Sequence, residues 1–179
     1  MAIKTFSDGV ALPASDINSF LTNAGLVYIT ETTASAVATK AVTGVFSAAY
    51  ENYRLIITNL TSNVNGLLTC QLGTAATAYS YGFAGYTYAG VADTLSLNAG
   101  TFWTFARTTA TSSGSVIVDI YRPQLVAATT FTASGITATG SLAGGGIHTT
   151  ALAYTDFTLA LFTAATFSAN IKIFGYRQA

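Results

Sequence analysis

From about residue 26 onward, the chain is a succession of short runs rich in β-branched and aromatic residues, each roughly six to ten residues long. In the run NYRLIITNL, the large side chains of Tyr53, Leu55 and Ile57 recur at every second position. Turn signals separate the runs: Asn65-Gly66, Gly73, Ala89-Gly90, Ser113-Gly114, Gly144-Gly145-Gly146 and Ser168-Ala169-Asn170. Short strands of this composition and spacing indicate an all-β sandwich or barrel.

No long helical pattern interrupts these runs, so an alternating α/β fold with a parallel sheet is not expected. We predict a single domain over residues 26–179. It should be an all-β, jelly-roll-like antiparallel β-sandwich of about eight to ten strands.

Residues 1–25 differ from the rest of the chain. Ser15 is suited to begin a short helix and Gly25 to end it. Ile17, Phe20 and Leu21 would form one apolar stripe on that helix. A helix of about ten residues is not stable alone in water, so it must dock on its own domain or on a partner. We predict an N-terminal anchoring segment over residues 1–25, whose contact residues are Phe6, Leu12, Ile17, Phe20 and Leu21.

The composition is unusual for a soluble domain, because only 8% of the residues are charged and 51% are hydrophobic. Ordinary domains carry about 25% charged residues. A chain with so little charge and zero formal net charge is poorly protected against self-association. We therefore expect a permanent assembly in which neighbours cover much of the surface.

Several partner classes find no support in the sequence. The seven Lys and Arg residues are scattered and form no patch for nucleic acid. Thr, Ser and Gly dilute the apolar residues, so no run reaches the roughly 18 residues that a membrane-spanning helix needs. The N-terminus has no apolar core typical of a secretory signal. We expect no nucleic-acid partner and no membrane insertion.

No catalytic or metal-binding motif is found. The chain has one cysteine, Cys70, and one histidine, His148, and its seven carboxylates are dispersed. We interpret Cys70 as a small buried apolar residue and the three glycines before His148 as a flexible tip. A lone histidine beside such a tip is a poor catalytic base. We predict a non-enzymatic protein with no catalytic residues, no metal site and no cofactor.

The segment YSYGFAGYTY (79–88) is the most aromatic part of the chain. Tyr, Gly and Ser together supply large contact area at low entropic cost. Alternating aromatic residues can pack in the core, cover a neighbouring subunit or stack on sugar rings. We therefore regard this set as a possible ligand site or subunit interface: Tyr79, Tyr81, Phe83, Tyr86 and Tyr88.

Three phrases resemble the structural proteins of tailed-bacteriophage virions. The opening FSDGVALPASDINSFL (6–21) is similar to their N-terminal pattern, in which Phe and Gly precede "vLtAsDvNtyL". The phrase FSAAYENYR (46–54) has their "F-s-x-x-Y-x-N-Y" form, and the ending IKIFGYRQA (171–179) looks like their "G-Y-R" close. The three phrases lie at the start, in an early strand and at the end, so the resemblance spans the domain.

The resemblance implies a virion protein that is assembled in the host cytoplasm and exposed on the particle surface. It implies a homotrimeric capsid decoration (cement) or head-fibre protein. Its N-terminal segment would contact the major capsid protein or another virion protein. The alternative is a tail fibre or minor tail protein whose β-sandwich binds a host surface glycan.

Overall fold

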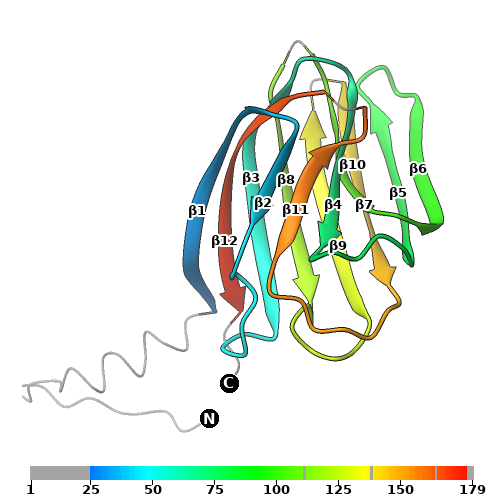
Figure 1. Cartoon of the computed structure of the whole chain (residues 1–179). Helices are drawn as coiled ribbons and strands as arrows, with labels where there is room; N and C mark the ends of the chain where they lie inside the picture. The colour runs from blue at the N-terminus through cyan, green and yellow to red at the C-terminus, as the bar shows by residue number, and fades with distance from the viewer. Residues whose placement is uncertain (1–24, 111, 138, 164, 177–179) are drawn as a thin grey trace, which may run out of the picture.

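The computed structural model describes residues 25–110, 112–137, 139–163 and 165–176. These residues form two antiparallel sheets that pack face to face (Figure 1). The strands are β1 (Leu26–Val37), β2 (Thr39–Val42), β3 (Asn52–Ser62), β4 (Gly66–Leu72), β5 (Tyr79–Thr87), β6 (Ala92–Gly100), β7 (Trp103–Thr108), β8 (Gly114–Tyr121), β9 (Thr129–Thr137), β10 (Gly140–His148), β11 (Phe157–Leu161) and β12 (Phe167–Tyr176). The predicted all-β antiparallel fold is confirmed, whereas the helix predicted near residues 15–24 lies outside the described residues.

The larger sheet has eight strands in the order β1-β12-β3-β8-β9-β10-β5-β6. The smaller sheet has four, in the order β2-β11-β4-β7, and lies in front of the larger sheet in Figure 1. The strands β1 and β6 form the two edges of the larger sheet. The pair β5–β6 stands at the far end, beside the smaller sheet's edge strand β7 (Figure 1).

The period-two pattern of the strands builds the core between the sheets. In β3, Leu55 and Ile57 are fully buried, while Arg54 and Ile56, which alternate with them, lie on the outer face. Adjacent strands repeat this alternation, because successive side chains of a strand point to opposite faces. The largest fully buried side chains fill the space between the sheets: Trp103, Tyr53, Tyr79, Phe46, Phe105, Phe131, Phe157 and Phe167.

The three consecutive glycines lie in the middle of a strand, so the predicted flexible tip is wrong. Gly144, Gly145 and Gly146 belong to β10, which pairs with β9 on one side and β5 on the other. A β-carbon on Gly144 or on Gly146 would lie 2.2 Å from a backbone oxygen of β5. Glycine is therefore needed for the close approach of two backbones.

The strand count also differs from the prediction, since the described residues form twelve strands where about eight to ten are expected. The segments that form β2, β6 and β10 are not runs rich in β-branched and aromatic residues. TKAV has only four residues, and ADTLSLNAG and GSLAGGGIH contain several Ala and Gly residues. These residues have low strand propensity, so pairing with neighbouring strands must decide their conformation.

Candidate functional site

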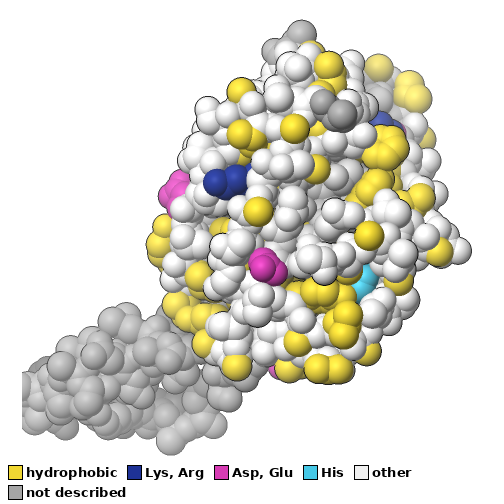
Figure 2. Space-filling model, in the orientation of Figure 1, with side chains coloured by type: hydrophobic (Ala, Val, Ile, Leu, Met, Phe, Trp, Pro, Cys, Tyr) yellow, Lys and Arg dark blue, Asp and Glu magenta, His cyan; other side chains and the backbone are white. Residues whose placement is uncertain are grey.

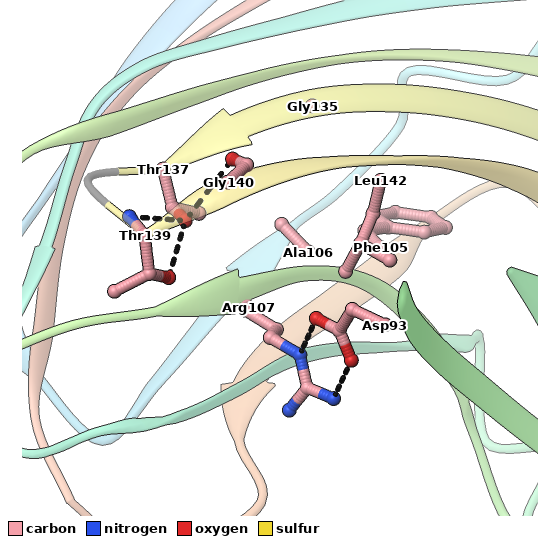
Figure 3. Close-up of a pocket in the computed structure, with 9 residues that line it drawn as sticks. All are labelled: Asp93, Phe105, Ala106, Arg107, Gly135, Thr137, Thr139, Gly140 and Leu142. Atoms are coloured by element: carbon pink, nitrogen blue, oxygen red, sulfur yellow. Dashed lines mark hydrogen bonds and ion pairs between the residues drawn. The ribbon is translucent and has the colours of Figure 1, made fainter. Parts of the chain in front are cut away.

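An open hollow of about 410 Å³ lies where the edge of the smaller sheet faces β6 of the larger sheet. We call it the β6–β7 hollow. Asn65 and four threonines stand beside the charged pair Asp93 and Arg107 and three small or apolar residues in its lining: Asn65, Gly66, Leu67, Thr87, Ala92, Asp93, Arg107, Thr108, Thr109 and Thr139. A narrow recess of about 10 Å³ adjoins it and shares Asp93, Arg107 and Thr139 (Figure 3). That volume is about what one water-sized group occupies.

An ion pair that joins the two sheets stands in this hollow. Asp93 lies on β6 in alternation with Leu95 and Leu97, on the face turned toward the smaller sheet. Arg107 comes from β7 and reaches Asp93 with two bonds, Nε to Oδ2 at 2.7 Å and Nη2 to Oδ1 at 2.6 Å (Figure 3). The side chains are 35% and 20% exposed, so the pair is accessible from solvent. Two parallel bonds fix the guanidinium plane as well as its charge.

Threonine residues also line the hollow and its recess. In the turn between β9 and β10, the Thr137 and Thr139 hydroxyls lie 3.1 Å apart, and the Thr139 carbonyl accepts a bond from the amide of Tyr88 at 3.0 Å. On β7, Thr108 is 3% exposed, and its Oγ1 has no hydrogen-bond partner among the described residues. Because buried hydroxyls are nearly always paired in proteins, Thr108 is an exception that needs an explanation.

A second hollow, of about 370 Å³, lies on the outer face of the larger sheet around Arg54 and Asp119. Arg54 donates two bonds to Asp119, at 2.8 and 2.7 Å, and the Tyr176 hydroxyl donates a third at 2.7 Å. Partial burial would raise the pKa of Asp119, but the bonds from Arg54 and Tyr176 outweigh it and hold that pKa below its ordinary value. Burial and the bond to Asp119 together raise the pKa of Tyr176 to about 12. The polar groups of this cluster satisfy one another.

The five aromatic residues predicted as one ligand site or interface divide between the core and the surface. Tyr79 and Phe83 are buried, and Tyr81 is half-buried with its hydroxyl accepting a bond from Thr104 at 3.0 Å. Tyr86 and Tyr88 are 64% and 67% exposed. Only these last two are presented to a partner by the described structure. Tyr88 follows Thr87, which lines the β6–β7 hollow.

His148 belongs to the core. It is fully buried, its ring lies 4.3 Å from the ring of Tyr79 between centroids, and its Nδ1 is 3.3 Å from the Tyr154 hydroxyl. Burial lowers the pKa of His148, and the nearby backbone of Thr77 and Thr150 only partly offsets this effect. The imidazole is therefore neutral at pH 7. Its Nε2 has no partner among the described residues.

The described residues contain no group of three or more His, Cys, Asp or Glu side chains placed to hold a metal ion. Of the same residues, none form a helix with the length and apolar character needed to span a bilayer. The predicted anchoring residues all lie outside the described part of the chain: Phe6, Leu12, Ile17, Phe20 and Leu21. Their role stays a prediction.

Sequence reasoning did not find Arg107 or Thr108. Both lie in TFWTFARTT, one of the short runs of β-branched and aromatic residues that indicate strands. The available signal was a single charged residue in a run that is otherwise uncharged. That signal could not show which carboxylate Arg107 would meet, because Asp93 belongs to the other sheet.

No protein-family model, no curated protein and no solved structure matches this chain. The function must therefore be argued from the fold, the hollows and the phrases quoted above.

Proposed function

We propose that this chain is a non-enzymatic structural protein of a tailed-bacteriophage virion. In this proposal it is a homotrimeric capsid decoration or head-fibre protein, exposed on the particle surface and attached through its N-terminal segment to the major capsid protein or another virion protein. The sandwich is a jelly roll.

The order of strand pairing is the observation that carries the proposal. Without the hairpins β5–β6 and β9–β10, eight strands remain: β1, β2, β3, β4, β7, β8, β11 and β12. The first pairs with the last, the second with the seventh, the third with the sixth and the fourth with the fifth. A single long hairpin rolled into a sandwich has this pairing, which supports a jelly roll. Viral capsid and lectin domains use that architecture.

The phrases that resemble virion proteins also support the proposal. The phrase 46–54 leads into β3, and the described part of the phrase 171–179 lies on β12, which is the neighbour of β3. Gly175 faces Tyr53 in the register of these strands, and the ring of Tyr50 packs on Gly175. Two phrases far apart in the sequence thus contact each other, because one supplies Tyr50 and Tyr53 and the other supplies Gly175, which pairs with Tyr53 and lies against the ring of Tyr50.

The outer face of the larger sheet supports self-assembly. Ile117, Ile136 and Tyr86 are 45%, 57% and 64% exposed on this face. Ile136 and Tyr86 share one row across the sheet, with only the small residue Ser141 between them. Apolar side chains gathered on a sheet face are typical of a surface that another subunit covers. Figure 2 shows the side of the molecule on which the smaller sheet lies, and this side also carries few charged side chains.

Two measurements test the proposal. Light scattering of the purified chain should give a trimer, and a monomer at every concentration would remove the trimer from the proposal. Mass spectrometry of purified particles should find the full-length chain and lose a variant without residues 1–25 that still folds. Incorporation of that variant at the normal level would contradict attachment through the N-terminal segment. Absence of the full chain from particles would contradict the virion role.

One observation favours a second candidate, a tail fibre or minor tail protein with a host-glycan-binding β-sandwich. The hydroxyl-lined β6–β7 hollow opens beside the exposed Tyr88. Labelling that places the chain only at the tail tip would favour this candidate over capsid decoration.

A further inference from the structure

We propose that the β6–β7 hollow is a binding site for a neutral sugar unit, held by Arg107, Asp93 and Thr108 and covered on one side by Tyr88. The inference deepens the second candidate function, but it concerns the isolated chain. It does not depend on where in a particle the chain resides, or on the chain being a virion protein.

The size of the hollow suits a small ligand. Its volume of about 410 Å³ falls within the range of roughly 300–1,000 Å³ that small-molecule sites occupy. The adjoining recess of about 10 Å³ has space for one hydroxyl-sized group beside Asp93 and Arg107. A polyhydroxylated ring could therefore rest in the hollow with one hydroxyl directed into the recess.

The charge of the site favours a neutral ligand over an acidic one. The carboxylate of Asp93 neutralises Arg107 through two short bonds. Nη1 of Arg107 makes no hydrogen bond within the described residues, so it remains available as a donor. Each carboxylate oxygen of Asp93 can accept a further bond. A sugar hydroxyl can both donate and accept a hydrogen bond. Asp93 offers it an acceptor and Nη1 of Arg107 offers it a donor. An anionic sugar would instead be repelled by the carboxylate of Asp93.

Thr108 supplies the independent sign that a ligand belongs here. Its hydroxyl is buried and lacks a partner among the described residues, a state that costs roughly 1–3 kcal/mol when nothing compensates for it. It lies beside Gly66, another lining residue, because a β-carbon on Gly66 would be 3.5 Å from Thr108 Oγ1. The same position is 3.3 Å from Thr163 Oγ1, so two threonine hydroxyls flank the backbone at Gly66. A ligand hydroxyl reaching Thr108 would satisfy it.

Tyr88, at the edge of the hollow, provides an aromatic surface on which a sugar ring can pack. Tyr88 is 67% exposed, and its amide is fixed to the Thr139 carbonyl at 3.0 Å, so its backbone is held at the edge of the hollow. Its ring offers a rigid, amphipathic contact at a small cost in side-chain entropy. The C–H face of a pyranose is apolar and can pack on such a ring while the hydroxyls face the polar lining.

The test is a titration of the purified full-length chain, followed by amide NMR shifts. The probes are methyl β-D-glucopyranoside, methyl β-D-galactopyranoside and methyl α-D-mannopyranoside, with methyl β-D-glucuronide as the acidic comparison. We expect at least one neutral glycoside to shift the amides of Asp93, Arg107 and Thr108 in a saturable way, with a Kd of about 1 mM. The glucuronide should bind more weakly.

Three variants decide whether the named residues form the site. Thr108→Val keeps the side-chain volume and removes the hydroxyl. Tyr88→Ala removes an exposed aromatic ring, and we expect the variant to fold because Tyr88 is 67% exposed. Each should weaken binding about tenfold, which corresponds to 1.4 kcal/mol. The matched control is Thr94→Val, also on β6 but exposed and outside the lining, which should leave the Kd unchanged.

Two results would overturn the inference. One is the absence of saturable shifts with all three neutral glycosides. The other is unchanged binding in both Thr108→Val and Tyr88→Ala, with their NMR spectra reporting folded protein. Neither result would affect the virion proposal, which is tested by incorporation into particles and by the oligomeric state.

Discussion

The ring of Tyr50 covers Gly175 so closely that a β-carbon on this glycine would lie 2.3 Å from the ring's Cγ. Gly175 is in β12, while Tyr50 is in the loop before β3, and the ring of Tyr50 also contacts that of Tyr53 edge-on at 6.0 Å. The Tyr53 hydroxyl in turn bonds the backbone of Ser47, at 2.6 Å to its amide and 2.7 Å to its carbonyl. This contact fastens the loop 43–51 to the strand near the C-terminus.

Gly175→Ala should therefore destabilise the fold. The added methyl group cannot fit unless Tyr50 moves away from its packing, and overpacking of this kind typically costs about 1–3 kcal/mol. Urea unfolding followed by circular dichroism measures the change in free energy. Gly82→Ala is the matched control, since a β-carbon on Gly82 of β5 has nothing within 4 Å. Equal stabilities of the two variants would show that the contact does not constrain the fold.

The ion pair between Arg107 and Asp93 should contribute a measurable coupling free energy across the sheets. Its side chains are partly buried and its geometry has two bonds, so we expect roughly 0.5–1.5 kcal/mol, above the typical surface pair. A double-mutant cycle of Arg107→Gln and Asp93→Asn in urea unfolding isolates this term.

The pair of Lys172 with Glu31 is the comparison for that cycle. Its charged atoms are 3.9 Å apart and its side chains are 48% and 40% exposed, so its coupling should be close to zero. If the Arg107 cycle gave a value as small as this pair, the guanidinium would not be held in place by Asp93. The geometry assigned to the sugar site would then lose its support.

Cys70 should be inert toward thiol reagents in the native protein. Its side chain is fully buried, and burial raises the pKa of its thiol, so neither access nor the reactive thiolate is available. We expect 5,5′-dithiobis(2-nitrobenzoate) to react at least about a hundredfold more slowly than with the urea-unfolded chain.

The control for this measurement places a cysteine at an exposed position, by Ser113→Cys in a Cys70→Ala background. That variant should react at the same rate whether it is folded or unfolded. Rapid and complete labelling of native Cys70 would mean that the smaller sheet opens readily, in conflict with a core position for this residue.

The sequence predicts much of this fold because most strands carry their own period-two pattern. In β3, the alternation of Leu55 and Ile57 with outward-facing residues is enough to assign both the strand and its buried face. Such local patterns do not depend on the neighbouring strand. The run in β10 shows the opposite case, since three glycines have no pattern and become a strand only because β5 and β9 pair on both sides.

The candidate site could be predicted only in fragments, for a related reason. The exposed Tyr86 and Tyr88 and the carboxylate of Asp93 are visible as residue types, but Tyr79 and Phe83 have the same aromatic character and are buried. Which aromatic side chains face outward depends on the register of β5. The partner of Asp93 depends on the packing of one sheet on the other. The register and the packing both belong to the tertiary structure, which a short window of sequence does not determine.

His148 should make the stability of the protein depend on pH below about 6.5. Burial lowers the pKa of this histidine in the folded state below its ordinary value of 6.5. As the pH falls below 6.5, the unfolded chain therefore binds a proton that the folded chain does not. The free energy of unfolding should fall by up to about 1.4 kcal/mol for each pH unit over which this difference holds. The chain has no second histidine, and the lowered pKa of Asp119 affects stability only near and below its ordinary value of 3.8.

Urea midpoints measured from about pH 7.5 to about pH 5 test this slope. The variant His148→Gln keeps a polar side chain without a titrating group, so it should be less stable at pH 7.5 but show a flat profile over the same range. A flat profile for the unmodified chain, or an unchanged slope in His148→Gln, would contradict the assignment of this pH dependence to the buried imidazole.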